Sequence, residues 1–279
     1  MQHLPTVAPA ITDACRKLLG DHAASTPDVD LFAQRRLDLV VCETLEIWRR
    51  GVAEILCDLG CATVFGPAAI MAFLSMAQCD DLDACPQPPE YYPPWRFRFR
   101  VVRDRIAGEV RKFVGEQRTA HPSLERYFEA FSRSLDAFDG IAENEDDKKR
   151  INAHPLCQIA YEQIEDTLDA GWKYVDDLVP SNVKRWGETQ KQVAALLGRL
   201  EAGIPPSEVA EPGCALSPQA ADLSSILVAG WVYESFWQLQ EPSKQRYDYT
   251  TLMRLILKGC EDAVLRRAYK ECCGKGGAE

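Results

Sequence analysis

The sequence has few of the residues from which catalytic and metal sites are usually built. It contains only four histidines, and none of them stands in a Glu-x-x-His or His-Glu-x-x-His pattern. Those patterns are typical of di-iron bundles and zincin metalloproteases, so the sequence predicts neither class. The chain also lacks the GxGxxG, Walker A and GxSxG motifs of nucleotide-binding loops and nucleophile elbows. We therefore expect no cofactor.

Charged residues are missing from one long run. No Asp, Glu, Lys or Arg occurs between Leu59 and Cys79, and an uncharged run of this length is a formal candidate for a membrane span. However, Gly66 and Pro67 interrupt the run, much of it is Ala, Gly, Ser and Thr, and no Trp/Tyr belt flanks it. We therefore predict a buried helix from Pro67 to Cys79 and no membrane partner.

A secretory leader is not expected either. Residues 1–20 have no basic segment followed by an apolar one, and the cysteine count of eleven is odd, which disfavours a closed set of disulfides. Both observations predict a reducing, cytoplasmic location, where most cysteines are small buried hydrophobic residues. A zinc site is the alternative, although its cysteine spacing is unusual. Its ligands would be Cys57, Cys61, Cys79 and Cys85.

The overall composition is that of a globular protein. Of the 279 residues, 46% are hydrophobic and 27% are charged, which is enough for one large domain or two small ones with a real core. The formal net charge is −10, so the surface as a whole should repel nucleic acid and anionic lipid.

The strongest pattern is one long amphipathic segment from Leu31 to Gly60. Its apolar residues recur at three- and four-residue spacing, which predicts a helix of about thirty residues. Asp30 is the expected N-cap, and Gly60 suits the C′ position, where a positive φ is needed. The predicted buried stripe consists of Leu37, Val40, Val41, Thr44, Leu45, Trp48, Val52, Ile55, Leu56 and Leu59.

The same spacing recurs along the chain and predicts an all-α fold, a multi-helix bundle of about eight helices. Further helices are expected at Ala8–Leu19, Trp95–Gln117, Asn182–Leu200, Ser217–Gln240 and Tyr249–Cys273. The first six residues from Trp95 alternate between aromatic and basic, so a strand is the alternative there. The last helix should bury Leu252, Leu255, Ile256 and Ala263, with Val264 left open.

Two proline-rich stretches, at 80–94 and 204–218, are predicted linkers. They separate an N-terminal helical region at 1–85, which contains an apolar core hairpin, from a central helical region at 95–203 and a C-terminal helix pair at 217–279. Packing of all three regions as one domain is the alternative.

A weak internal duplication lies in the central region. Residues 120–137 and 153–170 are identical at seven of eighteen positions, at an offset of 33 residues. Each copy begins with His-Pro, and proline suits the first position of a helix. A 33-residue period is typical of helical repeat arrays, so a helical-hairpin repeat is one interpretation, and two unrelated amphipathic helices are the other.

A basic patch is the least expected feature of this acidic chain. Between Trp95 and Lys112 there are seven basic and two acidic residues, a local charge of +5 (7 − 2). Arginine interleaved with aromatic residues suits docking to an acidic protein partner, contact with nucleic acid, or pairing within the chain itself. The candidate binding residues are Trp95, Arg96, Arg98, Arg100, Arg103 and Arg105.

A row of carboxylates supplies the best argument for an enzyme. Glu162, Glu165, Asp166, Asp169 and Asp176 share one side of a predicted helix. Paired acids at this spacing could bind Mg²⁺, with Glu162, Asp166 and Asp169 as the ligands. A solvent-facing acidic stripe gives the same pattern.

We therefore predict a non-catalytic protein-binding adaptor or regulatory subunit of a larger cytoplasmic assembly. Two alternatives stay open. One is an all-α enzyme that uses the carboxylate row to bind magnesium, and the other is a nucleic-acid-associated protein that uses the basic helix at 95–112.

Overall fold

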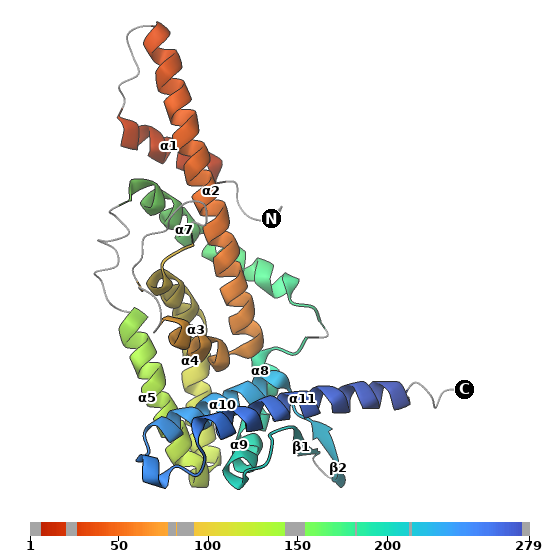
Figure 1. Ribbon diagram of the computed structural model, residues 1–279. Coiled ribbons are helices and arrows are strands. Elements are labelled where there is room, and N and C mark those ends of the chain that lie inside the picture. Colours follow the sequence, from red (N-terminus) through yellow and green to blue (C-terminus); the bar gives the residue numbers. More distant parts are fainter. Residues whose placement is uncertain are drawn as a thin grey trace. The chain divides into compact units, whose positions relative to one another are not determined.

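The computed structural model describes residues 7–20, 27–77, 82, 92–142, 154–181, 183–211 and 214–274. Helices make up most of these residues, which confirms the predicted all-α class (Figure 1). The described part contains ten α-helices and a single pair of short strands. Within it, no helix is both long enough and apolar enough to cross a membrane.

The elements follow one another with short connections. The first five helices are α1 (Ala8–Leu19), α2 (Pro27–Phe65), α3 (Pro67–Ala77), α4 (Trp95–Ala120) and α5 (Glu125–Ala142). They are followed by α7 (Pro155–Leu178), α8 (Trp186–Thr189), α9 (Val193–Ala202), β1 (Glu208–Glu211), β2 (Cys214–Ala220), α10 (Leu223–Gln238) and α11 (Tyr249–Gly274). Short 3₁₀ turns lie at Pro122–Leu124, Gln190–Gln192 and Pro242–Lys244.

The long helix α2 extends beyond both predicted ends. It begins at Pro27, so Asp30 lies inside the first turn instead of capping it, and it runs through Gly60 to Phe65. The turn comes at Gly66, which has φ +53°. The Trp186 ring occupies the space that a Cβ on Gly66 would need, so glycine is required there for two reasons. The predicted stripe itself is correct, because all ten of its residues are buried or half-buried.

The chain divides into two compact units. Unit 1 comprises residues 1–60, 74–103 and 140–181, and unit 2 comprises residues 61–73, 104–139 and 182–279.

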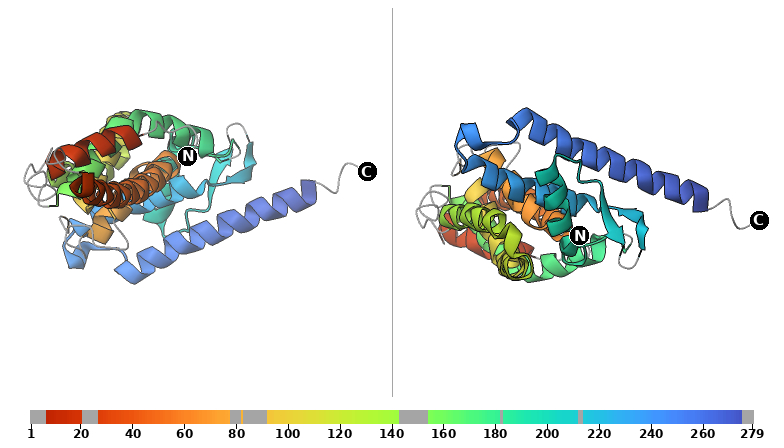
Figure 2. Two further views of the ribbon diagram at one scale, coloured as in Figure 1. Left: turned by 90° about the horizontal axis from the view of Figure 1, so that it is seen from above. Right: turned by 90° about the horizontal axis from the view of Figure 1, so that it is seen from below.

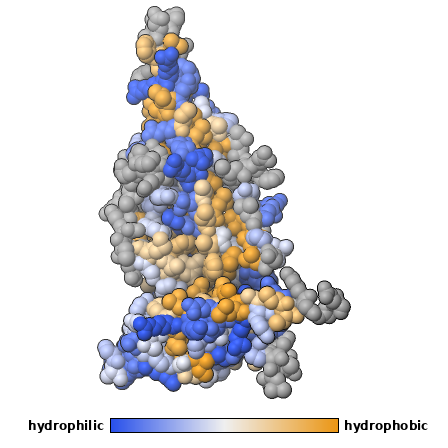
Figure 3. All heavy atoms as spheres, turned by 45° about the vertical axis from the view of Figure 1, so that its right-hand side comes forward, coloured by the Kyte–Doolittle hydropathy of each residue, from blue (hydrophilic) through white to orange (hydrophobic). Residues whose placement is uncertain are grey.

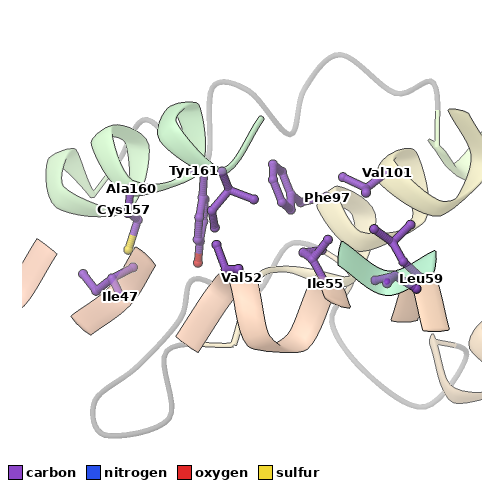
Figure 4. Packing of buried hydrophobic residues seen from close by; sticks show 11 residues of the cluster. Ile47, Val52, Ile55, Leu59, Phe97, Val101, Cys157, Ala160 and Tyr161 are labelled. Carbon is purple, nitrogen blue, oxygen red and sulfur yellow. The ribbon is translucent and has the colours of Figure 1, made fainter. Parts of the chain in front are cut away.

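In unit 1, the core lies between α2, α4 and α7. Figure 4 shows the α2 side chains Val52, Ile55 and Leu59 turned toward Phe97 of α4 and Tyr161 of α7. The Phe97 and Tyr161 rings stack with their centroids 5.2 Å apart. A second cluster joins Val7, Ile11 and Cys15 of α1 to Leu37 of α2, so the inner face of the N-terminal part of α2 is covered as well.

In unit 2, aromatic rings form much of the core. The edge of the Phe113 ring meets both Phe128 and Trp186, with centroid distances of 5.9 and 4.9 Å. Helices α10 and α11 pack side by side, with the β1–β2 hairpin next to α11 (Figure 2). The two helices approach closely because Gly230 has no side chain: a Cβ there would lie 2.8 Å from Cδ1 of Ile256.

The structure corrects several local predictions. Residues 204–218, expected to be a linker, contain the antiparallel hairpin β1–β2, and the helix predicted from Ser217 begins at Leu223 instead. The helix predicted from Asn182 begins at Trp186 and is broken into α8, a 3₁₀ turn and α9. The strand alternative at Trp95 is wrong, because α4 is helical from its first residue.

The two duplicated segments bury equivalent positions in different units. Phe128 and Phe131 of α5 are buried in unit 2, and their counterparts Tyr161 and Ile164 of α7 are buried in unit 1. A 3₁₀ turn precedes α5, whereas α7 begins directly at Pro155. Shared burial follows from any amphipathic helix, so the duplication stays a prediction.

Candidate functional site

The predicted arginine patch of α4 is largely engaged inside unit 1. Arg98 donates two hydrogen bonds of 2.6 Å to the Asp58 carboxylate, and its guanidinium lies 4.3 Å from the centre of the Trp95 ring. The Arg98 and Asp58 side chains are only 13% and 4% exposed, and Glu54 lies 3.6 Å from Arg98 as a second carboxylate. Arg98 is therefore part of the interior.

Two further arginines are also engaged. Arg96 is buried, and its Nη1 donates a 2.6 Å hydrogen bond to the carbonyl oxygen of Ile141. Arg100 pairs with Glu165 of α7 at 2.5 Å and lies over the Phe97 ring, 5.2 Å from its centre. Arg103 is half-buried, and only Arg105 among the five candidate arginines is exposed. The six candidate residues therefore do not form one open surface.

Burial governs the protonation of this cluster. It raises the pKa of the Asp58 carboxyl, and the hydrogen bonds from Arg98 only partly oppose that effect. Burial also raises the pKa of the nearby Cys57 thiol, and the charges of Glu54 and Asp58 raise it further. A thiol held in its protonated form is a poor nucleophile, so Cys57 is unsuited to covalent catalysis.

The sequence does contain a signal for the Asp58 pair. Asp58 lies three residues after Ile55 and seven after Gly51, on the edge of the apolar stripe of α2. A carboxylate in that position requires a buried partner, because an unpaired buried charge is costly. No local pattern, however, indicates that this partner is forty residues away.

The predicted magnesium ligands are only partly described. Glu162 is exposed and accepts a 3.0 Å hydrogen bond from Gln158, and Asp166 is also exposed. The neighbouring carboxylate of Glu165 is engaged by Arg100, and the side chain of Asp169 lies outside the described residues. Among the described residues, no three His, Cys, Asp or Glu side chains are placed to hold a metal ion.

The cysteines behave in a similar way. The eight described cysteines are all free thiols. Of the four proposed zinc ligands, Cys57 and Cys61 are exposed, and Cys79 and Cys85 lie outside the described residues.

Unit 2 contains an apolar groove that the sequence analysis did not predict. The groove has a volume of about 640 Å³ and lies between the N-terminal turns of α10 and the middle of α11. One wall is formed by Leu223 and Leu227 of α10. The remaining lining residues are Phe65, Cys260, Glu261, Val264 and Leu265. We call this feature the α10–α11 groove.

The α10–α11 groove continues into a polar hollow of about 490 Å³, which shares Phe65 and Leu223 with it. Asp222 organises this end, because its carboxylate accepts hydrogen bonds from Lys184 at 3.0 Å, Arg267 at 2.7 Å and Gln192 at 2.9 Å. The two cations and one carboxylate leave a net charge of +1 there.

The groove was missed because α11 has two apolar stripes. The sequence analysis found the buried one, and it left Val264 open. The second stripe, Met253, Leu257, Cys260 and Val264, has spacings of four, three and four residues, which place it beside the first. Val264 and Leu265 are 50% and 64% exposed, and Leu257 and Tyr269 are exposed as well. Figure 3 shows apolar residues, in orange, on the surface next to the grey C-terminal tail.

Comparison with protein-family models, curated proteins and solved structures gives no match for this chain. The functional conclusion therefore depends on the geometry alone.

Proposed function

We propose that this chain is a non-catalytic protein-binding subunit of a larger assembly, and that it binds an amphipathic helix of a partner protein in the α10–α11 groove. The observation that carries the proposal is the groove itself, with exposed Val264 and Leu265 along one wall. Apolar surface gathered in this way on a protein typically marks an interaction site. The free thiols of the described cysteines suit a reducing compartment and support a cytoplasmic assembly.

The shape of the groove favours a helix as its occupant. Leu223 and Leu227 are one helical turn apart and face the Val264 and Leu265 side of α11. Two roughly parallel helical walls with an apolar floor accept a third helix whose apolar residues recur at i, i+4 and i+7. Extended peptides dock instead on free sheet edges.

Charge at the two ends sets the polarity of the partner. Glu261 is the single charged residue among the described residues that line the apolar part, whereas Lys184 and Arg267 line the polar hollow. Glu261 and Arg267 are six residues apart on α11, or about 9 Å along the helix. We therefore expect the partner helix to have a basic residue near Glu261 and an acidic residue near Lys184 and Arg267.

A designed peptide tests this proposal. An eighteen-residue fluorescent helix with leucines at i, i+4 and i+7, lysine at one end and glutamate at the other should bind with micromolar affinity in fluorescence anisotropy. Val264→Glu should weaken binding at least tenfold, because it places a charge in the apolar wall. Leu239→Glu is the matched control, because Leu239 is an exposed leucine that does not line the groove.

The charge pattern supplies a second test. A peptide with the lysine and glutamate ends exchanged and the same leucines should bind more weakly to the native protein. Equal binding of both peptides would contradict the predicted polarity. Absence of binding by either peptide, or equal weakening by Val264→Glu and Leu239→Glu, would contradict the groove as the docking site.

A further inference from the structure

The outer face of the N-terminal part of α2 is a second apolar surface, far along the chain from the groove. Phe32 and Leu39 are 75% and 72% exposed, and Leu31 is exposed as well. Phe32 and Leu39 are seven residues apart and therefore share one side of the helix. The opposite side is already covered, because Leu37 packs against α1 (Figure 1). We call the outward stripe, with the charged residues beside it, the α2 outer face.

The charges of the α2 outer face are segregated about Leu39. Arg35 and Arg36 lie on its N-terminal side, are exposed, and make no ion pair with any described residue. Glu43 lies on the C-terminal side and is also exposed. Positive charge thus precedes the central leucine and negative charge follows it.

We infer that the α2 outer face pairs with the same face of a second copy of this chain, as an antiparallel two-fold dimer centred on Leu39. A two-fold axis at Leu39 places residue i opposite residue 78 − i. Arg35 then lies opposite Glu43 of the other copy, and Glu43 opposite its Arg35, while the two Leu39 side chains meet on the axis. A two-fold interface is self-complementary in this way.

The parallel arrangement is disfavoured by the same charges. It would place Arg35 and Arg36 against their own equivalents and Glu43 against Glu43. Like charges in contact oppose association and select against a wrong register. An unrelated acidic partner would suit the arginines but not Glu43, whereas a second copy satisfies both signs.

The expected association is weak. The stripe from Leu31 to Glu43 spans twelve residue steps, or about 18 Å of helix. Two such helices bury an area at the low end of the range for specific interfaces, about 1,200 Å² in total or less. We therefore expect a dissociation constant on the order of tens of micromolar.

Sedimentation velocity over a range of about 1 to 300 µM measures this association. The native chain should pass from monomer to dimer within that range. Arg35→Glu/Arg36→Glu should be monomeric, because glutamate then faces Glu43, and Glu43→Arg should be monomeric, because arginine then faces Arg35. Circular dichroism at 222 nm checks that both variants keep the native helix content.

Mixing provides the decisive control. In a 1:1 mixture of the two variants each contact is attractive again, so a heterodimer should form although neither variant dimerises alone. The variant with all three substitutions should dimerise with itself. If Glu43→Arg disturbs the fold, Leu39→Lys replaces it as the test of the central contact, because that side chain is exposed and its loss leaves the core intact.

A native chain that stays monomeric at about 300 µM would overturn the inference and leave the α2 outer face to a different protein. Dimerisation that survives Arg35→Glu/Arg36→Glu and Leu39→Lys, or variants that fail to form the heterodimer, would overturn it as well. Val264→Glu in the α10–α11 groove should not affect dimerisation. The failure of the peptide experiment and the failure of this one are therefore independent.

Discussion

Arg98 is the residue whose replacement tests most directly whether the arginines of α4 belong to the interior. Arg98→Met removes the guanidinium but keeps an unbranched apolar side chain of similar length. The Asp58 carboxylate, 4% exposed, then loses both of its 2.6 Å hydrogen bonds. Breaking a buried ion pair from one side costs about 3–5 kcal/mol, so we expect the free energy of unfolding to fall by about that amount.

Urea unfolding followed by circular dichroism at 222 nm measures the loss. Arg105→Met is the matched control, because Arg105 belongs to the same helix and is exposed, and it should change stability by less than about 0.5 kcal/mol. The double variant Asp58→Leu/Arg98→Met should recover most of the loss, since a buried pair replaced by apolar residues leaves no unpaired charge.

The effect should depend on pH in a defined direction. Burial raises the pKa of Asp58 in the folded protein, and removal of Arg98 removes the hydrogen bonds that oppose it. A carboxyl with a higher pKa when folded than when unfolded favours the folded state at low pH, and this contribution is lost as pH rises through the folded pKa. The stability gap between Arg98→Met and the native protein should therefore widen from about pH 4 to pH 7.

A loss below about 1 kcal/mol for Arg98→Met would refute this reasoning, and so would a loss equal to that of Arg105→Met. Either result would mean that Arg98 faces solvent, and it would restore the arginine patch as a candidate docking surface.

Other predictions concern the end of α2, metal binding and nucleic acid. Gly66→Ala should lower stability by about 2–4 kcal/mol, since alanine would be strained at positive φ and would clash with Trp186, whereas Gly60→Ala, inside the helix, should raise it by about 1 kcal/mol. Thermal melts compare the two, and the reverse order would place the turn at Gly60. Millimolar Mg²⁺ or Mn²⁺ should not raise the melting temperature beyond a salt control, whereas a metal-specific rise lost in Asp166→Asn would favour the enzyme alternative. Binding to DNA or RNA should be weak and abolished by salt, and tight binding in a mobility-shift assay at physiological salt would contradict the protein-binding proposal.

Local periodicity predicted the helices well because it reports which face of a helix is buried. The stripe of α2 was complete except for Ile47, which is fully buried, and α1 has the predicted bounds from Ala8 to Leu19. The same reasoning failed at the end of α2. Both Gly60 and Gly66 suit a turn by residue type, and only the packing of Trp186, 120 residues later, distinguishes them.

The candidate sites depended on contacts that no local pattern contains. Seven basic residues near Trp95 predict a charged surface, but the carboxylates that engage Arg98 and Arg100 are 40 and 65 residues away in the chain. The α10–α11 groove combines α11 with the end of α2 and the start of α10, so its lining could not be assembled from the sequence. Its one local signal was the second apolar stripe of α11, which ends at Val264.

The interleaving of the two units has a consequence for how the chain is made. Unit 1 needs residues up to 181 before it is complete, and its core is formed by α2 together with α4 and α7. At a synthesis rate of about 5–20 residues per second, the 121 residues from position 60 to position 181 take roughly 6–24 s.

During that interval the apolar stripe of α2 has been synthesised without the helix α7 that later covers it. Exposed stripes of this kind promote aggregation of nascent chains, and chaperones bind them. Truncation cannot shorten the wait, because a fragment cut anywhere between residues 60 and 181 lacks part of the unit 1 core. The chain is therefore expected to depend on ribosome-associated chaperones for its yield, and a fragment ending near residue 140 should be recovered mainly in aggregates.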